Sequence, residues 1–198
     1  MKSDNEMPKQ WIRNIKKIDD KNHLAHGVIY AQDGSIRSFR VAENEVEARV
    51  EGAPGDFYNV RIQFKEFTED EKGYLTDYIK GNPIIYSKLL NNQISLDFLN
   101  ADVKILPSST DDFELSCDCG RGLFCKHQAA VFHKLANIIE DDPSFMFSLR
   151  GLNLNQIING SHGKIKSISD VLSNDSKPRL TDSENINHLV KLNYSLSD

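Results

Sequence analysis

All three cysteines of this chain lie in one short segment that also contains a histidine. The segment runs Cys117-Asp118-Cys119, continues through five residues, and closes with Cys125-Lys126-His127. Thiolates and an imidazole are preferred zinc ligands, and four of them complete the tetrahedral shell of a structural site. Because sulfur-rich ligation favours zinc over other metals, we expect one Zn²⁺ ion bound by Cys117, Cys119, Cys125 and His127.

The spacing of these ligands predicts a strand followed by a tight turn. Residues two apart on a strand point to the same side, so Cys117 and Cys119 can face one ion together. The chain must then reverse before Cys125. Gly120 and Gly122 lie in this interval and can adopt the backbone conformations that such a turn requires.

A helix from about residue 126 to 140 is the clearest helical pattern in the chain. His127, Val131 and Leu135 are spaced four apart, so the imidazole lies on the same stripe as the core residues. A bound ion would therefore hold a strand, a turn and a helix together at one point.

Three other interpretations of the cysteines are weaker. Unrelated buried cysteines would rarely cluster so closely by chance. A redox Cys-x-Cys pair leaves Cys125 and His127 unexplained. A Cys-His nucleophile needs a base placed by the fold and a substrate cleft, and the sequence marks neither. We therefore expect no catalytic residue, no small-molecule substrate and no enzyme. We also expect His23 and His26 to be ordinary polar residues, and His133, six residues past His127, not to share the ion.

Alternating apolar and polar residues between about 27 and 65 predict an antiparallel sheet with one solvated face. A first strand at 28–30 is expected to pair with 36–41 through the turn Asp33-Gly34. Further strands are expected at about 46–50 and 58–64. The pattern predicts about four strands in this region.

Helices are predicted after the sheet. Thr68 and Glu71 form a capping box, and the helix should end near Gly81-Asn82. Pro83 can open a second helix. A short helix followed by a strand at 103–106 is expected within residues 94–106.

The C-terminal part combines the strand that delivers the first cysteine with short helices. Residues 113–116 are expected to form that strand, 144–150 a short helix, and 153–158 a small turn. From Gly160 onward, serine, asparagine and charged residues dominate. We expect 160–198 to be a flexible tail, with a short helix at about 186–192.

These elements predict the α+β class: a small antiparallel β-sheet followed by helices and a strand-turn-helix zinc finger. The expected division is an N-terminal segment, a sheet with helices, the finger with its following helices, and the tail, at residues 1–26, 27–106, 107–159 and 160–198. In the first segment an apolar stripe could dock on the body; its members are Trp11, Ile12, Ile15 and Ile18.

Composition limits the classes of function. The formal net charge is −5, so the chain is no polycation, and nucleic-acid contact would need a local basic patch. No stretch is apolar enough to cross a bilayer, and the N-terminus lacks the apolar core of a secretory signal. We therefore expect a cytoplasmic protein without membrane contact.

The segment from Leu115 to Val131, LSCDCGRGLFCKHQAAV, resembles the SWIM zinc finger. That family is defined by Cys-x-Cys, a variable gap and Cys-x-His on a strand-strand-helix unit, and all four ligand positions are filled here. A looser likeness to stand-alone prokaryotic SWIM proteins extends over about residues 10–155, including the segments 26–30, 58–62, 141–143 and 147–151. The resemblance implies DNA-binding or protein-interaction roles, often alongside Swi/Snf-type helicases, and no catalysis.

Two functions remain open. The finger could be an adaptor that docks a helicase or another nucleic-acid-processing partner. Alternatively, basic residues could contact DNA or RNA directly, helped by backbone amides at the start of the helix at 126. The candidate contacts are Arg121, Lys126, Arg49, Arg61 and Lys65. A solvated surface is the competing interpretation of all five charges, and it is favoured for the last three, because glutamates are interleaved with them.

Overall fold

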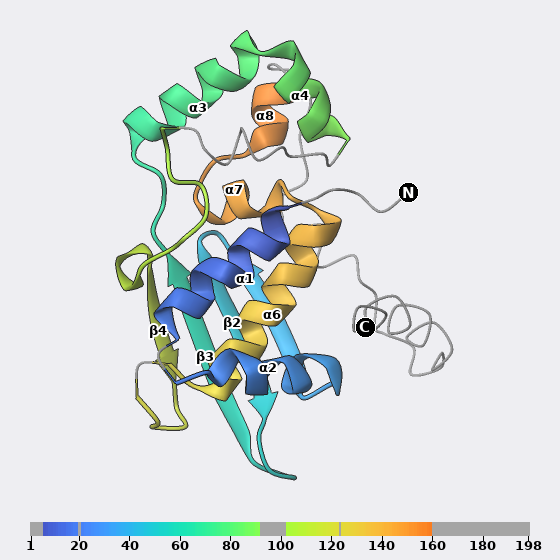
Figure 1. Cartoon of the computed structure of the whole chain (residues 1–198), viewed down its shortest axis with the longest axis vertical. Coiled ribbons are helices and arrows are strands. Elements are labelled where there is room, and N and C mark those ends of the chain that lie inside the picture. Colours follow the sequence, from blue (N-terminus) through green and yellow to red (C-terminus); the bar gives the residue numbers. More distant parts are fainter. Residues whose placement is uncertain (1–5, 20, 92–101, 123, 160–198) are drawn as a thin grey trace, which may run out of the picture. The chain divides into compact units, whose positions relative to one another are not determined.

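In the computed structural model, four antiparallel strands form one sheet in the order β1-β2-β3-β4 (Figure 1). The strands are β1 (Ile36–Ala42), β2 (Glu45–Glu51), β3 (Phe57–Phe64) and β4 (Phe113–Cys117). The turn at Glu43-Asn44 joins β1 to β2, and Gly52 to Gly55 lie in the turn between β2 and β3. The sheet and the helices described below confirm the predicted α+β class.

The structure describes residues 6–19, 21–91, 102–122 and 124–159. These all belong to the first of two units into which the chain divides, residues 1–165 and 166–198. The predicted tail with its helix at 186–192, and the predicted helix after residue 94, lie outside the described residues. No helix in the described ranges has the length and apolar character needed to cross a membrane.

The two faces of the sheet differ in character. On the inner face, valine and isoleucine side chains are buried; examples are Val46, Val50, Val60 and Ile62. On the outer face the side chains are mostly exposed, and they include three arginines, Arg40, Arg49 and Arg61. The register pairs Arg49 with Asn59 and Arg61 with Glu47, so these polar side chains lie side by side across the strands.

Three helices cover the inner face: α1 (Met7–Ile18), α2 (His23–Gln32) and α6 (Lys126–Asp141) (Figure 1). Helix α6 packs against α1, α2 and strands β2, β3 and β4. Trp11 and Ile15 of α1 are fully buried, and the indole N–H of Trp11 donates to the Phe132 carbonyl at 3.0 Å. Two members of the predicted N-terminal stripe are therefore part of the core, whereas Ile12 and Ile18 are half-buried.

The predicted strand at 28–30 is wrong, because these residues belong to α2. The reason is a close helix–helix contact: a Cβ on Gly27 would lie 2.4 Å from the Cβ of Ala129. Only a glycine lets α2 approach α6 this closely. Of the apolar residues that follow it, Val28 and Tyr30 are half-buried, whereas Ile29 is exposed. Asp33-Gly34 consequently follows a helix instead of forming a hairpin. The fourth strand of the sheet is β4, far along the chain.

The remaining helices mostly agree with the sequence. Thr68 and Glu71 form the predicted capping box at the start of α3 (Glu69–Gly81), and Pro83 opens α4 (Pro83–Leu90). The helix that follows the cysteines is α6, as predicted. Two short helices then follow, α7 (Phe145–Leu149) and α8 (Leu154–Asn159).

The predicted strand at 103–106 is wrong, because this segment is irregular. Val103, Ile105 and Leu106 are nevertheless buried, so the apolar residues pack on the core without joining the sheet. Arg150 supplies hydrogen bonds that a sheet would otherwise provide. Its guanidinium donates to the Lys104 carbonyl and, at 3.2 Å, to the Ile105 carbonyl.

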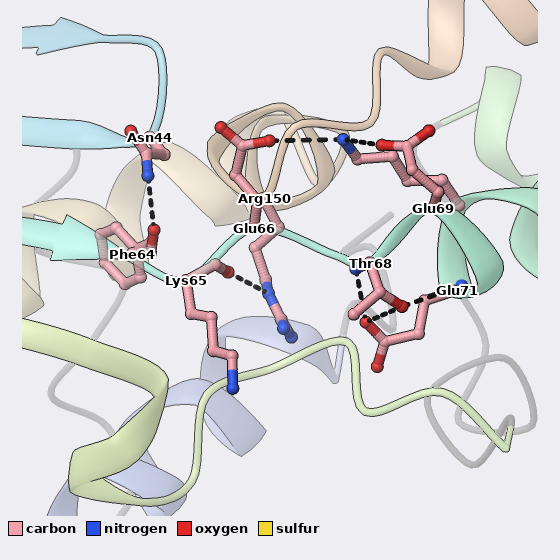
Figure 2. A network of polar contacts seen from close by, with 9 residues as sticks. Asn44, Phe64, Lys65, Glu66, Thr68, Glu69, Glu71 and Arg150 are labelled. Atoms are coloured by element: carbon pink, nitrogen blue, oxygen red, sulfur yellow. Dashed lines mark hydrogen bonds and ion pairs between the residues drawn. The ribbon is translucent and has the colours of Figure 1, made fainter.

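Arg150 also contacts the segment that connects β3 to α3, where its guanidinium lies beside Lys65 (Figure 2). Its Nε donates to the Lys65 carbonyl at 3.0 Å, and its guanidinium lies 4.1 Å from the ring centre of Phe67. Only 4% of Arg150 is exposed, and burial lowers its pKa from the usual value. One buried cation thus satisfies carbonyls from two separate segments.

Asp112 forms a second buried polar contact, in the short 3₁₀ turn η1 (Thr110–Asp112) that precedes β4. Burial alone would raise its pKa. The Lys104 ammonium and the N–H groups of Ser108 and Ser109 outweigh burial and lower the pKa from 3.8 to about 2.

Asp112→Asn is expected to destabilise the fold by about 2 kcal/mol at pH 7, the free energy that such a lowered pKa represents. Because the folded pKa lies below the unfolded value, this stabilisation is complete above about pH 4 and is lost as the pH falls towards 2. Urea unfolding at several pH values measures it, with the exposed neighbour Asp111→Asn as the matched control. Equal destabilisation by both variants at pH 7 would contradict the assignment.

Candidate metal centre

The structure brings Cys117, Cys119, Cys125 and His127 together, with one ligand atom from each within 4.8 Å of all the others. Cys117 ends β4, Cys119 lies in the following turn, Cys125 is the N-cap of α6, and His127 is in its first turn. A tetrahedral zinc site places two sulfurs about 3.8 Å apart, and a sulfur and a nitrogen about 3.6 Å apart. The four side chains therefore fit a metal ion of this kind with only small adjustments.

The turn that carries the ligands has the backbone that the glycines predict. Gly120 has a φ of +67° and Gly122 a φ of +97°, both in the left-handed region that other residues avoid. Asp118 anchors the start of the turn to β3. Its carboxylate accepts from the Asn59 backbone N–H at 2.9 Å and from the Asn59 side-chain amide at 2.8 Å.

The thiols shift one another's pKa values in opposite directions. The hydrogen bond between Cys117 and Cys125 raises the pKa of Cys117 and lowers the pKa of Cys125 to about 4. His127 and the backbone N–H of Gln128 also lower the pKa of Cys125. A thiolate is thus favoured at the N-terminus of α6, where the helix dipole stabilises negative charge.

His127 directs its Nδ1 towards the sulfurs. This atom lies 3.8 Å from Cys117 Sγ and 4.0 Å from Cys125 Sγ. Nε2 is buried and has no hydrogen-bond partner among the described residues. The ring stacks on Tyr58 at 4.3 Å between centres and meets Tyr30 edge-on at 5.8 Å. These contacts fix the orientation of the imidazole, so Nδ1 is the nitrogen available to a metal.

Coordination through Nδ1 leads to a spectroscopic prediction. In zinc-loaded protein, long-range ¹H–¹⁵N spectra are expected to show His127 with a protonated Nε2 and a metal-bound Nδ1. The neutral tautomer is set by whichever nitrogen binds the metal. A spectrum with the proton on Nδ1 would contradict the orientation described here.

Gly52 leaves room for this ring. A Cβ at residue 52 would lie 2.6 Å from Tyr58 Cε2 and 3.2 Å from His127 Nε2. Gly52→Ala is therefore expected to displace the stacked pair and to weaken zinc binding by about tenfold or more, as changes behind metal ligands commonly do. Competition with a chromophoric chelator measures the affinity.

Gly73→Ala is the matched control for that experiment. Nothing lies within 4 Å of a Cβ built at Gly73, which is in α3. Alanine there should leave zinc affinity unchanged and raise helix stability slightly. Unchanged zinc affinity in Gly52→Ala would show that the ring tolerates the displacement.

The predicted contact residues do not form one patch. Lys126 donates to the Tyr30 hydroxyl and lies 4.6 Å from that ring centre, so this half-buried side chain already has a partner within the chain. Arg49 and Arg61 share the outer face of the sheet, where Arg49 lies over the Phe57 ring and Arg61 pairs with Glu45. The other two, Arg121 and Lys65, are exposed, Arg121 in the ligand-bearing turn and Lys65 just after β3.

Three residues that support His127 were not identified from the sequence: Tyr30, Gly52 and Tyr58. Tyr58 had the pattern of a strand residue, and Gly52 that of an ordinary turn. The signal that could have found Tyr58 is its place on a strand next to the predicted finger strand. Its stacking on the histidine depends on the β3–β4 pairing, which local patterns do not reveal.

Comparison with known proteins supports the same site. Residues 98–136 match the SWIM zinc finger family. The chain is also 27% identical over 147 residues to "Uncharacterized protein Rv2102" of Mycobacterium tuberculosis, an alignment that covers 72% of this chain. The chain therefore spans about half of that relative, because the alignment covers 53% of the relative's length. No solved structure shows a significant match. With its four clustered ligand residues inside the matched segment, the chain carries a SWIM zinc finger.

Proposed function

We propose that this protein is a zinc-binding, non-catalytic adaptor that docks a nucleic-acid-processing partner such as a Swi/Snf-type helicase. The observation that supports it is the closed ligand set: three thiols and one imidazole nitrogen supply four donors, which fill a tetrahedral zinc shell. No position remains for a reacting water or substrate. Zinc then stabilises the junction between β4 and α6, and the function lies in the surfaces that this junction holds in place.

Charge also favours a protein partner. The net charge of −5 opposes broad attraction to nucleic acid. Arg61 of β3 pairs with Glu45, and Arg37 of β1 pairs with Glu51, so carboxylates already neutralise part of the basic charge of the sheet.

A direct binding assay tests the proposal. The zinc-loaded chain is immobilised, and a purified Swi/Snf-type helicase from the same organism is passed over it. Saturable binding that is lost in Cys119→Ser, which lacks one ligand, is the expected result. Failure of the helicase to bind, together with tight binding of DNA, would contradict the adaptor function.

Direct nucleic-acid binding is the second candidate, and one observation favours it. The outer face has a groove of about 750 Å³ whose lining includes Arg40, Arg49 and Arg61. Arg49 lies over the exposed Phe57, which could stack on a base. If this candidate is correct, the logarithm of the affinity for duplex DNA should fall by about 0.9 per phosphate contact for each log unit of salt. Arg49→Glu should weaken that binding.

A further inference from the structure

Strand β4 is at the edge of the sheet, and no strand among the described residues lies beyond it. The pairing with β3 determines which backbone N–H and C=O groups of β4 point towards β3 and which point to the free edge. Lys65 N–H donates to the Asp112 carbonyl, and Asp118 N–H donates to the Asn59 carbonyl. Both pairs continue the β3–β4 register, in which Phe64 faces Phe113.

Hydrogen-bonded pairs alternate along an antiparallel ladder. Glu114 and Ser116 therefore direct their N–H and C=O groups towards β3. Phe113, Leu115 and Cys117 direct theirs away from it, to the free edge. This edge offers backbone donors and acceptors in the pattern that another strand requires.

A pocket of about 260 Å³ adjoins the free edge. We call it the edge pocket. Its apolar lining comes from β4, α1 and the residue before the N-cap of α6; the residues are Ile18, Phe113, Leu115 and Phe124. Leu115 is half-buried, so the inner face of the sheet is incompletely covered at this edge. The volume suits one large apolar side chain.

Two cations also line the edge pocket, Lys21 and Arg121. Both are exposed, and neither forms an ion pair with a described carboxylate within 4.0 Å. Lys21 follows α1, whereas Arg121 lies in the ligand-bearing turn, so the two charges come from segments far apart in the sequence. A binding partner that places a carboxylate here would gain two favourable interactions.

We propose that the free edge of β4 and the edge pocket bind an extended acidic segment of a partner protein, which adds to the sheet as a fifth strand. An apolar side chain of that segment fills the edge pocket, and acidic side chains meet Lys21 and Arg121. Backbone hydrogen bonds supply affinity, while the pocket and its charges supply selectivity.

Several observations favour a peptide over nucleic acid at this place. A strand edge pairs with peptide backbone and has no counterpart in a phosphodiester chain. Four of the lining residues are apolar, and only two are cations, whereas a nucleic-acid site needs more positive charge along the backbone. The inference rests on the proposed adaptor function, because it names the surface that would hold the partner.

The test uses the full-length, zinc-loaded protein and a short fluorescein-labelled peptide in which leucine alternates with aspartate. Fluorescence anisotropy measures binding, and amide hydrogen exchange maps it. Saturable binding is expected, with slower exchange at Phe113 and Leu115. The same peptide with N-methylated backbone amides cannot pair with a strand and should not bind. Equal binding of both peptides would overturn the inference.

Charge reversal tests the two cations. The double variant Lys21→Glu/Arg121→Glu should weaken peptide binding about five- to tenfold, as expected for two exposed ion pairs. The control Lys80→Glu/Lys134→Glu changes the net charge equally at two exposed lysines that do not line the edge pocket, so the affinity of this variant for the peptide should be unchanged. Zinc content and thermal midpoint, measured on both variants, verify that each is folded.

The outcomes separate this inference from the proposed function. If the helicase binds but the double variant Lys21→Glu/Arg121→Glu binds it normally, the docking surface lies elsewhere and only the inference fails. If the peptide binds at β4 but the helicase does not bind, only the helicase function fails. Displacement of the peptide by single-stranded DNA, with the same dependence on Lys21 and Arg121, would overturn the inference in favour of a nucleic-acid site.

Discussion

Cys119→Ser is expected to reduce bound zinc from one ion per chain to almost none after dialysis against a mild chelator. Even changes behind a metal ligand lower affinity by about 10–100-fold, and removal of a ligand should exceed that. Because zinc binding to such fingers contributes folding free energy, order in the segment from Cys117 to His127 should be lost as well. Metal analysis by mass spectrometry and amide exchange across the segment measure the two effects.

Ser116→Ala is the matched control. Ser116 is exposed and adjoins Cys117 on β4, but its side chain points to the outer face of the sheet. This variant should keep one zinc ion and normal exchange. Equal zinc content in Cys119→Ser and the parent protein would overturn the ligand assignment.

Arg150→Met is expected to destabilise the fold by about 3 kcal/mol or more. Methionine keeps much of the apolar side chain but removes every donor, which leaves the carbonyls of Lys65, Lys104 and Ile105 without this partner in a buried place. It also removes the stacking of the guanidinium on Phe67. Urea unfolding at neutral pH measures the loss.

Arg40→Met separates this effect from the general loss of a positive charge. Arg40 is exposed, and its nearest ion pair, with Glu47, is long at 3.9 Å. Its replacement should change stability by less than about 0.5 kcal/mol, as is usual for surface substitutions. Arg150→Lys should resemble Arg150→Met more than the parent, because an ammonium cannot reach carbonyls from two segments at once. Near-normal stability of Arg150→Met would contradict the role assigned to the guanidinium.

The sequence predicts best what short-range chemistry determines. The capping box of Thr68 and Glu71, the helix break at Asn82-Pro83 and the helix after Cys125 depend on neighbours within one turn, and all are present. The cluster of four potential ligands is predictable for the same reason, since it is contained in one continuous segment.

What the sequence does not reveal depends on distant segments. Residues 28–30 have the composition of a strand, yet they belong to α2, which packs closely on α6 where Gly27 meets Ala129. Arg150 satisfies carbonyls at residues 65, 104 and 105, which no local pattern connects. Gly52 and Tyr58 acquire their importance only when β3 pairs with β4 and brings His127 against them.

The pairing of β4 with β3 makes the finger inseparable from the rest of the molecule. A fragment limited to the matched residues 98–136 would retain all four ligands. It would lack Tyr58 beneath the histidine, Asn59 beside the turn and Trp11 against the helix. Metal binding alone would then have to fold a segment that has little hydrophobic core of its own. In this protein the zinc finger is therefore poorly suited to transplantation, and a minimal functional fragment would have to begin before α1.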